Sequence, residues 1–293
     1  MLTRISPFVL LGLSLAATAA RADFLPPNNL HLEDGLRSAN LTEKDFNEVI
    51  DEAQAIYAPI IKNTHKGTLK INRLWTNTTV NASATQIGSS WEVNMYGGLA
   101  RRPEITRDGF SMVLCHEIGH HLGGYPFSSS WAANEGESDY FATISCARQL
   151  WKDSPEANAE FRKTIAASPK AKCDAVWTDE TDQDLCYRTM AAGKSTADLL
   201  SALGGTKIGW DTPDKKVVKS TDNAHPQGQC RLDTYMAGAL CNKEFDEKII
   251  PGKDLGSRRN GKDAEMATAK FTCTKYEDYD VGVRPLCWFK PAL

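Results

Sequence analysis

His116, Glu117 and His120 form an H-E-x-x-H pattern, the arrangement in this chain best suited to do chemistry. Residues four apart lie one above the other on one face of an α-helix, so the two histidines can each give one ring nitrogen to a single zinc ion. Glu117 is rotated by about 100° from His116, which places it beside the expected metal rather than on it. There it can accept a proton from water that the zinc ion activates, as a general base does in metal-assisted hydrolysis.

The residues around this motif predict the helix that must carry it. Phe110, Val113 and Leu114 recur at helical spacing before the motif. Asp108 is a candidate N-cap, and the glycines at 123–124 predict the end of the helix. The alternative is a buried helix with two incidental histidines, which is costly because its polar groups would then lack partners.

A catalytic zinc site needs a third protein ligand and keeps one position for water. Glu135 and Asp139 are four residues apart, so they share a face if this segment is helical. Glu135 can complete a site of two histidines and one glutamate, and Asp139 can accept the outer N–H of a liganding histidine. Glu137 points elsewhere on a helix and is the lesser candidate. A solvated acidic start of a helix is the alternative interpretation of the same residues.

These paired motifs resemble those of the gluzincin metallopeptidases, and the N-E-x-x-S-D run at 134–139 resembles the thermolysin type. Other segments are more similar to the peptidase family of the CAAX prenyl endopeptidases and the HtpX-type quality-control proteases. These segments are T-V-N-A-S-A at 79–84, W-E-V-N-M-Y-G-G-L at 91–99, E-G-E-S-D at 135–139, and His225-Pro226 with Arg231. The resemblance covers roughly residues 70 to 235. Two departures are Ser138, where alanine is usual, and the short spacing of 14 residues between His120 and Glu135.

The resemblance implies a role for each matching residue. It implies one zinc ion per chain held by His116, His120 and Glu135, with Glu117 as the base, Asp139 behind a ligand, and His225 and Arg231 near the site. These last two could ligate or gate the metal in a resting form, or donate to the developing oxyanion. The alternative for His225 is a simple turn at 223–226.

The segment before the zinc helix predicts a small β-sheet. Trp91, Val93 and Met95 alternate with polar residues, and residues 69–75 alternate in the same way. We therefore expect an α+β fold in which a small sheet packs on the zincin active-site helices, with additional helices and a disulfide-stapled C-terminal tail. An edge strand could pair with an extended peptide, although an edge covered by a loop fits the sequence equally well.

The first 22 residues have the features of a signal peptide. A basic start at Arg4 precedes a short apolar run at 8–17, and Ala20-Arg21-Ala22 offers an A-x-A cleavage site. We expect cleavage after Ala22, or else after Ala20. No later run is long enough to span a membrane. The sequence therefore predicts an exported protein, periplasmic or secreted, with no transmembrane segment after signal cleavage.

Export predicts that the cysteines form disulfide bonds, because disulfides persist in oxidising compartments. The eight cysteines are Cys115, Cys146, Cys173, Cys186, Cys230, Cys241, Cys273 and Cys287. Pairing of neighbours would join 115 to 146 across the two zinc helices and close loops at 173–186, 230–241 and 273–287, each worth about 3 kcal/mol. A free regulatory thiol at Cys115 is the alternative. Without any C-x-x-C pair, a zinc site of four cysteines is disfavoured.

Composition and patterning bound the remaining properties. A chain of 293 residues with 41% hydrophobic content can bury a sizeable core, and a net charge of −3 gives no electrostatic case for nucleic acid. The expected organisation is a signal peptide at 1–22, a lead-in and core helix at 23–67, a metallopeptidase domain at 68–243, and a loop-rich, disulfide-bonded appendage at 244–293. The core helix is expected to begin at Thr42. The sequence does not indicate an oligomeric state.

The motifs together predict an exported zinc endopeptidase that acts on polypeptide substrates with Glu117 as general base. One alternative is a zinc-binding periplasmic chaperone or binding protein without turnover. Glu117 argues against it, because a structural zinc site is normally closed by four ligands and has no use for a base. Another alternative is a zinc hydrolase that acts on a non-peptide amide.

Overall fold

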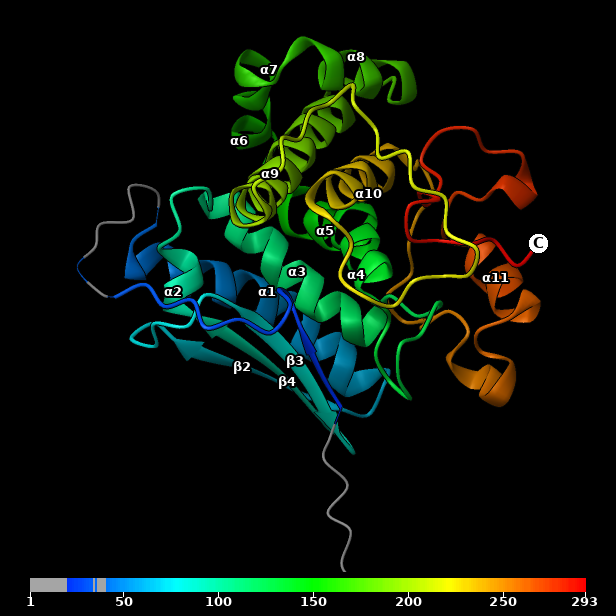
Figure 1. Ribbon diagram of the computed structural model, residues 1–293, viewed down its shortest axis with the longest axis horizontal. Coiled ribbons are helices and arrows are strands. Elements are labelled where there is room, and N and C mark those ends of the chain that lie inside the picture. Colours follow the sequence, from blue (N-terminus) through cyan, green and yellow to red (C-terminus); the bar gives the residue numbers. More distant parts are fainter. Residues whose placement is uncertain (1–19, 34, 36–40) are drawn as a thin grey trace, which may run out of the picture.

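The computed structural model describes residues 20–33, 35 and 41–293, so residues 1–19 of the expected signal peptide lie outside the described part of the chain. The described residues form an α+β fold in which helices cover one face of a small mixed sheet (Figure 1). The predicted fold class is therefore confirmed.

The sheet has four strands in the order β1-β3-β4-β2. They are β1 (Arg21–Asp23), β2 (Thr68–Leu74), β3 (Ala82–Ile87) and β4 (Ser90–Tyr96). β4 is parallel to β2 and antiparallel to β3, and β3 is antiparallel to β1. Trp91, Val93 and Met95 are buried, as their alternation predicts. β1 contains the expected cleavage position after Ala22, whereas cleavage after Ala20 would leave this strand whole.

The other elements are helical. They are α1 (Glu43–Asn63), α2 (Gly97–Ala100), α3 (Arg107–Leu122), α4 (Glu135–Phe141), the π-helical turn η1 (Ala142–Cys146), α5 (Ala147–Trp151), α6 (Pro155–Ala159), α7 (Phe161–Thr164), α8 (Ala167–Val176), α9 (Glu180–Gly204), α10 (Gly228–Leu240), the 3-10 turn η2 (Lys253–Arg258), α11 (Lys262–Ala269) and the 3-10 turn η3 (Lys275–Glu277). α9, with 25 residues, is the longest helix in the described part of the chain.

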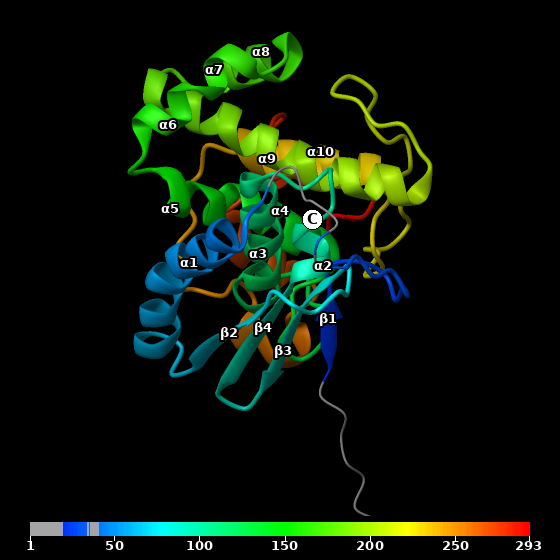
Figure 2. The same ribbon diagram turned by 90° about the vertical axis from the view of Figure 1, so that its left-hand side faces the viewer.

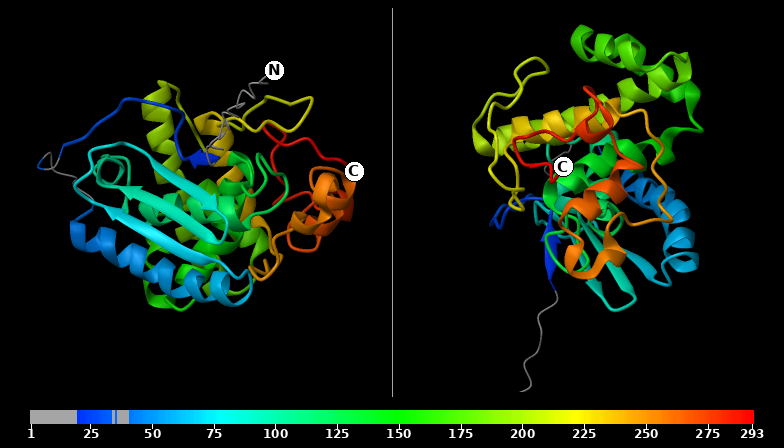
Figure 3. Two further views of the ribbon diagram at one scale, coloured as in Figure 1. Left: turned by 90° about the horizontal axis from the view of Figure 1, so that it is seen from below. Right: turned by 90° about the vertical axis from the view of Figure 1, so that its right-hand side faces the viewer.

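α1 and α3 form the layer of helices on the sheet, and α9 and α10 lie on the far side of α3 and α4 (Figures 1 and 2). α1 begins at Thr42, whose side chain forms a capping box with Asp45, and its residues Phe46, Val49 and Tyr57 are buried. The opposite face of the sheet is turned away from these helices (Figure 3, left). α3 is thus enclosed by other elements, and all of its residues from Gly109 to Leu122 are buried.

The C-terminal residues contribute to the same core as the helices. Trp288 lies against Gly136 of α4, where an added Cβ would meet its indole ring at 2.1 Å. Phe245 packs edge-to-face on Phe141, with 5.2 Å between the ring centroids. α11 and the segments around it lie at one side of the molecule (Figures 1 and 3), where α11 packs mainly against η2.

Four disulfides join the eight cysteines, so Cys115 is not a free thiol. Two predicted pairs, Cys115–Cys146 and Cys173–Cys186, are present. The other two predictions are wrong, because the bonds are Cys230–Cys287 and Cys241–Cys273. The physical reason is that residues 230 and 241 stand at opposite ends of α10, about 16 Å apart along a helix. A disulfide needs Cα atoms about 4.4–6.8 Å apart.

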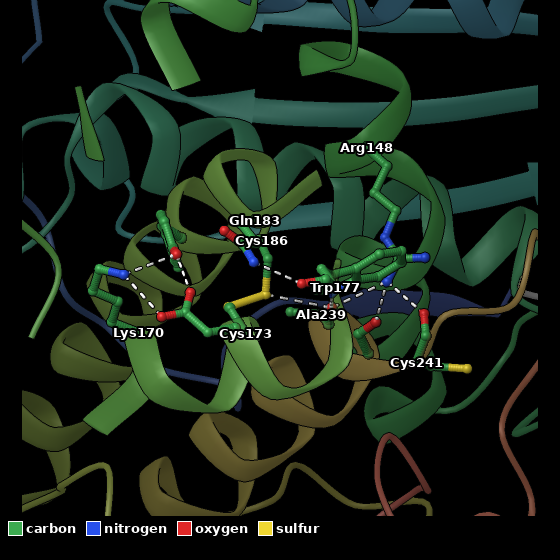
Figure 4. Close-up of a disulfide and its surroundings, with 11 residues drawn as sticks. Arg148, Lys170, Cys173, Trp177, Gln183, Cys186, Ala239 and Cys241 are labelled. Atoms are coloured by element: carbon green, nitrogen blue, oxygen red, sulfur yellow. Dashed lines mark hydrogen bonds and ion pairs between the residues drawn. A yellow bond between two sulfur atoms is a disulfide. The ribbon is translucent and has the colours of Figure 1, made fainter. Parts of the chain in front are cut away.

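The Cys173–Cys186 bond joins α8 to α9 next to the end of α10 (Figure 4). The Arg148 side chain donates to the last carbonyl groups of α10, including Ala239 O at 3.1 Å and Cys241 O at 2.6 Å. Trp177 Nε1 donates to Ala239 O at 3.2 Å. These donors satisfy carbonyl groups that a helix end leaves open.

Four disulfides fit an exported protein. Among the residues that the structure describes, no helix combines the length and the apolar character needed to cross a membrane.

Candidate metal centre

α3 holds the H-E-x-x-H residues in the middle of the molecule. Its N-cap is Thr106, whose side chain accepts from Gly109 N at 3.0 Å, so the predicted cap at Asp108 is wrong by two residues. Asp108 instead forms a two-point ion pair with Arg188 of α9, with Arg188 Nε 2.7 Å from Oδ2. The helix ends at Leu122 as predicted, and the following turn has its left-handed residue at Gly124, with φ of 76°.

α4 crosses α3 closely and brings Glu135 to the histidines. The Asn134 side chain caps α4 by accepting from Glu137 N at 2.9 Å. Gly119 is the point of closest approach, since a Cβ there would lie 2.9 Å from Ser138 O. The absence of a side chain at this one position lets the two helices share a site. Cys115–Cys146 fastens α3 to η1, directly before the first histidine.

His116, His120 and Glu135 offer ligand atoms that all lie within 4.8 Å of one another, so the three residues could bind a metal ion. His116 Nε2 is 3.3 Å from Glu135 Oε2, and His120 Nε2 is 3.7 Å from Glu135 Oε1. Both Nε2 atoms and Glu135 Oε2 are buried and have no hydrogen-bond partner within the described residues. Buried polar atoms nearly always have partners, so three orphaned atoms facing one point fit a bound cation.

The outer nitrogen of each histidine is held by a neighbour. His116 Nδ1 donates to Asp139 Oδ1 at 2.7 Å, and His120 Nδ1 donates to Ala133 O at 2.9 Å. Ser138 Oγ also lies 2.9 Å from His120 Nδ1. With the Nδ1 atoms engaged in this way, the Nε2 atoms of both rings face the centre of the cluster, which is the orientation that metal ligands require.

The charges of the cluster are set by burial and by the neighbouring carboxylates. Burial lowers the pKa of His116, but the Asp139 carboxylate outweighs burial and raises this pKa to about 9. Burial lowers the pKa of His120 to about 4. Burial acts to raise the pKa of Glu135, yet the two histidines hold it below its usual value. A metal ion that binds here must therefore displace a proton from His116.

Glu117 lies beside the cluster and is fully buried. Both of its carboxylate oxygens lack a hydrogen-bond partner in the described part of the chain. Burial raises the pKa of Glu117 well above its usual value, and the carboxylates of Glu135 and Asp23 add to that effect. A carboxyl group in this environment is suited to hold a proton.

A buried polar network supports Asp139 from α10. Arg231 Nε donates to Asp139 Oδ2 at 2.6 Å, and the Tyr235 hydroxyl donates to Asp139 Oδ1 at 2.6 Å. Burial acts to raise the pKa of Asp139, but Arg231 and His116 lower it to about 2. Arg231 thus acts on the cluster through Asp139, and its Nη2 also lies 3.1 Å from His116 Nδ1. The sequence reasoning missed Tyr235, although its position four residues after Arg231 places both on one face of the helix.

His225 and Glu137 have different surroundings. His225 Nε2 is 3.5 Å from Glu135 Oε2 and donates to the backbone oxygen of Asp23 at 2.7 Å. Glu137 points away from the histidines and pairs with Arg284 at 3.2 Å, while burial raises its pKa to about 8. The structure therefore brings His225 to the edge of the cluster and leaves Glu137 outside it.

The chain matches no protein-family model, and no curated protein or solved structure is similar enough to count as a match. Geometry and donor chemistry therefore carry the functional argument.

Proposed function

We propose that this protein is a zinc-dependent endopeptidase of the gluzincin type, exported to the periplasm or the extracellular space. One observation carries the proposal: the unpartnered ligand atoms of His116, His120 and Glu135 converge next to the unpartnered carboxylate of Glu117. All four side chains are buried, so their polar atoms lack the water that would otherwise satisfy them. A bound metal and a water molecule would satisfy the whole set.

The donor set favours zinc among the common metals. Two imidazole nitrogens and one carboxylate oxygen suit zinc, and three protein ligands leave the fourth position of a tetrahedral site open. When bound there, zinc would polarise a carbonyl group and lower the pKa of water to about 7. An open site with an adjacent carboxylate favours catalysis over a purely structural role.

Glu117 would take the proton from water and deliver it to the leaving amine. Its carboxylate suits both tasks, because it lies beside the cluster and both of its oxygens lack another partner among the described residues. His225 already donates to a backbone carbonyl at the edge of the cluster. In a substrate complex this donor would hold the carbonyl of the bond to be cut and stabilise the oxyanion that develops there.

A peptide is the substrate class best supported. β3 already pairs with an extended segment of backbone at the side of the sheet next to the cluster. Main-chain pairing at a strand is a common way to hold an extended peptide regardless of its sequence. A small non-peptide amide would make no use of this strand.

The test measures zinc content and digestion of an unfolded protein by the purified chain, with and without a chelator. We expect one zinc ion per chain, and we expect Glu117→Gln to keep the zinc while hydrolysis falls by about 10²–10⁴-fold. Glu137→Gln is the matched control. Glu137 is also fully buried, but it points away from the histidines and pairs with Arg284, so this variant shows the effect of losing a buried carboxylate outside the cluster. Full activity in Glu117→Gln would overturn the proposal. Zinc without hydrolysis, both in the unaltered protein and after Phe24→Ala, which removes the ring that packs on His116, would favour the binding-protein alternative.

A further inference from the structure

The first described residues of the chain run along the open side of β3 as an extended strand (Figure 2). Ala22 lies opposite Ala84 in the antiparallel register of β1 and β3. Beyond β1 the backbone pairing continues, since Phe24 N donates to Ala82 O at 3.1 Å. The whole segment 21–25 thus adds a strand to the sheet in the way that an extended peptide does.

The Asn81 side chain forms hydrogen bonds with the backbone of Leu25, the residue that follows Phe24. Leu25 N donates to Asn81 Oδ1 at 2.9 Å, and Asn81 Nδ2 donates to Leu25 O at 3.3 Å. One amide group therefore satisfies both polar atoms of a single residue of the strand. Hydrogen bonds of this kind involve only main-chain atoms of the strand, so Asn81 could hold a strand of almost any sequence.

The segment also passes the metal centre, where two successive carbonyl groups are bound by side chains of the site. His225 Nε2 donates to Asp23 O at 2.7 Å, and Arg231 Nη1 donates to Phe24 O at 2.8 Å. Ordinary strand pairing needs neither of these side-chain donors. Their presence distinguishes this strand from a mere extension of the sheet.

Phe24 anchors the segment beside the ligands. Its side chain is fully buried, and its ring lies edge-to-face against His116 with 5.2 Å between the centroids. The guanidinium of Arg231 lies over the same ring, 4.3 Å from its centroid. The pocket that holds Phe24 is therefore formed by a metal ligand and by the arginine that supports Asp139.

We infer that residues 21–25 occupy the peptide-binding groove of the metal centre in the manner of a substrate, so that the chain with this segment in place is self-blocked. The inference rests on the proposed function, since it names what occupies and regulates the same site. It also defines the class of peptide that the site takes once the segment leaves. That peptide is extended, with a large aromatic or apolar residue following the carbonyl group that His225 binds.

The test uses the zinc-loaded chain expressed from Ala20 onward, so that β1 is retained, and a fluorescent peptide that copies residues 20–27. Phe24→Ala removes the anchor of the internal segment. Phe245→Ala is the matched control, because it removes a buried phenyl group that packs on Phe141 and Phe271, away from the groove. Ala22→Pro is a second way to loosen the segment, because proline cannot donate to the strand pairing and no cavity is created.

Binding is measured by anisotropy in chains that also carry Glu117→Gln, so that the peptide stays intact. We expect Phe24→Ala and Ala22→Pro to bind the peptide at least about tenfold more tightly than the parent, because the fraction of open groove sets the apparent affinity. Phe245→Ala should bind it like the parent. A peptide with glycine in place of the phenylalanine should lose that gain. In chains that keep Glu117, hydrolysis of a quenched form of the peptide should rise by the same factor.

The outcomes separate this inference from the proposed function. Equal peptide binding by the parent and by both loosened variants, or an equal gain in Phe245→Ala, would overturn self-blocking even where hydrolysis is observed. A gain in binding confined to the two loosened variants, with no hydrolysis in any chain, would support occupancy of the groove and overturn the peptidase.

Discussion

α3 carries two buried histidine environments on neighbouring faces, and they differ in what their nitrogen atoms meet. In the candidate metal centre, the Nε2 atoms of His116 and His120 converge on a carboxylate and lack other partners among the described residues. The next residue, His121, is stacked between two indole rings, with centroids 5.2 Å from Trp91 and 4.9 Å from Trp131. Its Nε2 lies 3.4 Å from a backbone oxygen, that of Glu92.

The difference shows that burial alone does not make a histidine a ligand. Both environments exclude water, and burial lowers the pKa of His120 to about 4 and that of His121 to about 3. What distinguishes the candidate metal centre is the convergence of several potential ligand atoms, together with partners that hold each outer nitrogen. The His121 environment is filled by aromatic packing instead.

The largest effect is expected on zinc binding, when the same substitution, histidine to phenylalanine, is made separately at position 120 and at position 121. His120→Phe should reduce zinc affinity by more than about 100-fold, because even the loss of a group behind a ligand costs about 10–100-fold. His121→Phe should keep one zinc ion per chain, because a phenyl ring can replace an imidazole between two indoles. Metal analysis of both purified variants checks this. Equal zinc in the two proteins would remove the distinction between the two faces.

Removal of the arginine behind the metal centre should destabilise the protein strongly. Arg231→Met leaves the buried Asp139 carboxylate without its main counter-charge, which should lower the free energy of unfolding by about 3–5 kcal/mol. Arg73→Met is the control, because Arg73 pairs with an exposed carboxylate, Asp51, and should cost no more than about 1 kcal/mol. Urea unfolding of the zinc-free proteins measures both. Similar losses in the two variants would mean that the Arg231 network adds nothing beyond a surface pair.

Removal of one disulfide at a time distinguishes bonds that stabilise only the fold from a bond that also supports the candidate metal centre. Replacing both cysteines of Cys115–Cys146, or both of Cys173–Cys186, with alanine should lower the free energy of unfolding by about 3–4 kcal/mol in the chain-entropy treatment. Only the first change should also weaken zinc binding, because only that bond fastens α3 to the turn that follows α4. Unfolding curves and competition titrations with a zinc chelator give the two quantities. A fall in zinc affinity in both variants would show that the effect is global.

The smallest effect is expected on the free energy of unfolding, which should depend on pH because His121 takes up a proton when the chain unfolds. Burial lowers the pKa of this residue from 6.5 to about 3, so the folded state keeps it neutral while the unfolded state takes up a proton. Stability from this source is complete above pH 6.5 and is lost as the pH falls toward about 3.

Relative to His121→Phe, the parent should therefore lose about 1.4 kcal/mol more between pH 7.5 and pH 5.5. Urea unfolding of both zinc-free proteins at the two pH values measures this difference. Parallel loss in parent and variant would place the titration elsewhere.

The sequence predicts the parts of this protein that follow from local geometry. The spacing of His116 and His120 places them on one turn of a helix, and the spacing of Glu135 and Asp139 does the same for α4. The capped start of α1 and the alternation in β4 are likewise set by neighbours along the chain. The same local logic forbids a bond between Cys230 and Cys241 once α10 is recognised.

Other features depend on which distant segments meet, and no local pattern contains that information. Glu137 forms a hydrogen bond with Arg284, and Asp139 forms hydrogen bonds with Arg231 and Tyr235. Each of these pairs joins residues about 90 or more positions apart. Residues 23–40 have the composition of an irregular lead-in, yet the lead-in begins with a strand on β3 and with Phe24 packed on His116.

The sequence by itself thus determined the candidate ligands, the candidate base and the class of fold, because helical and strand periodicity fix which side chains share a face. Only the tertiary structure decided the partners of the candidate ligands, two of the four disulfides and the pairing of residues 21–25 with β3. The physical reason is that these depend on the packing of whole helices and strands, which is settled by the burial of surfaces far apart in the chain.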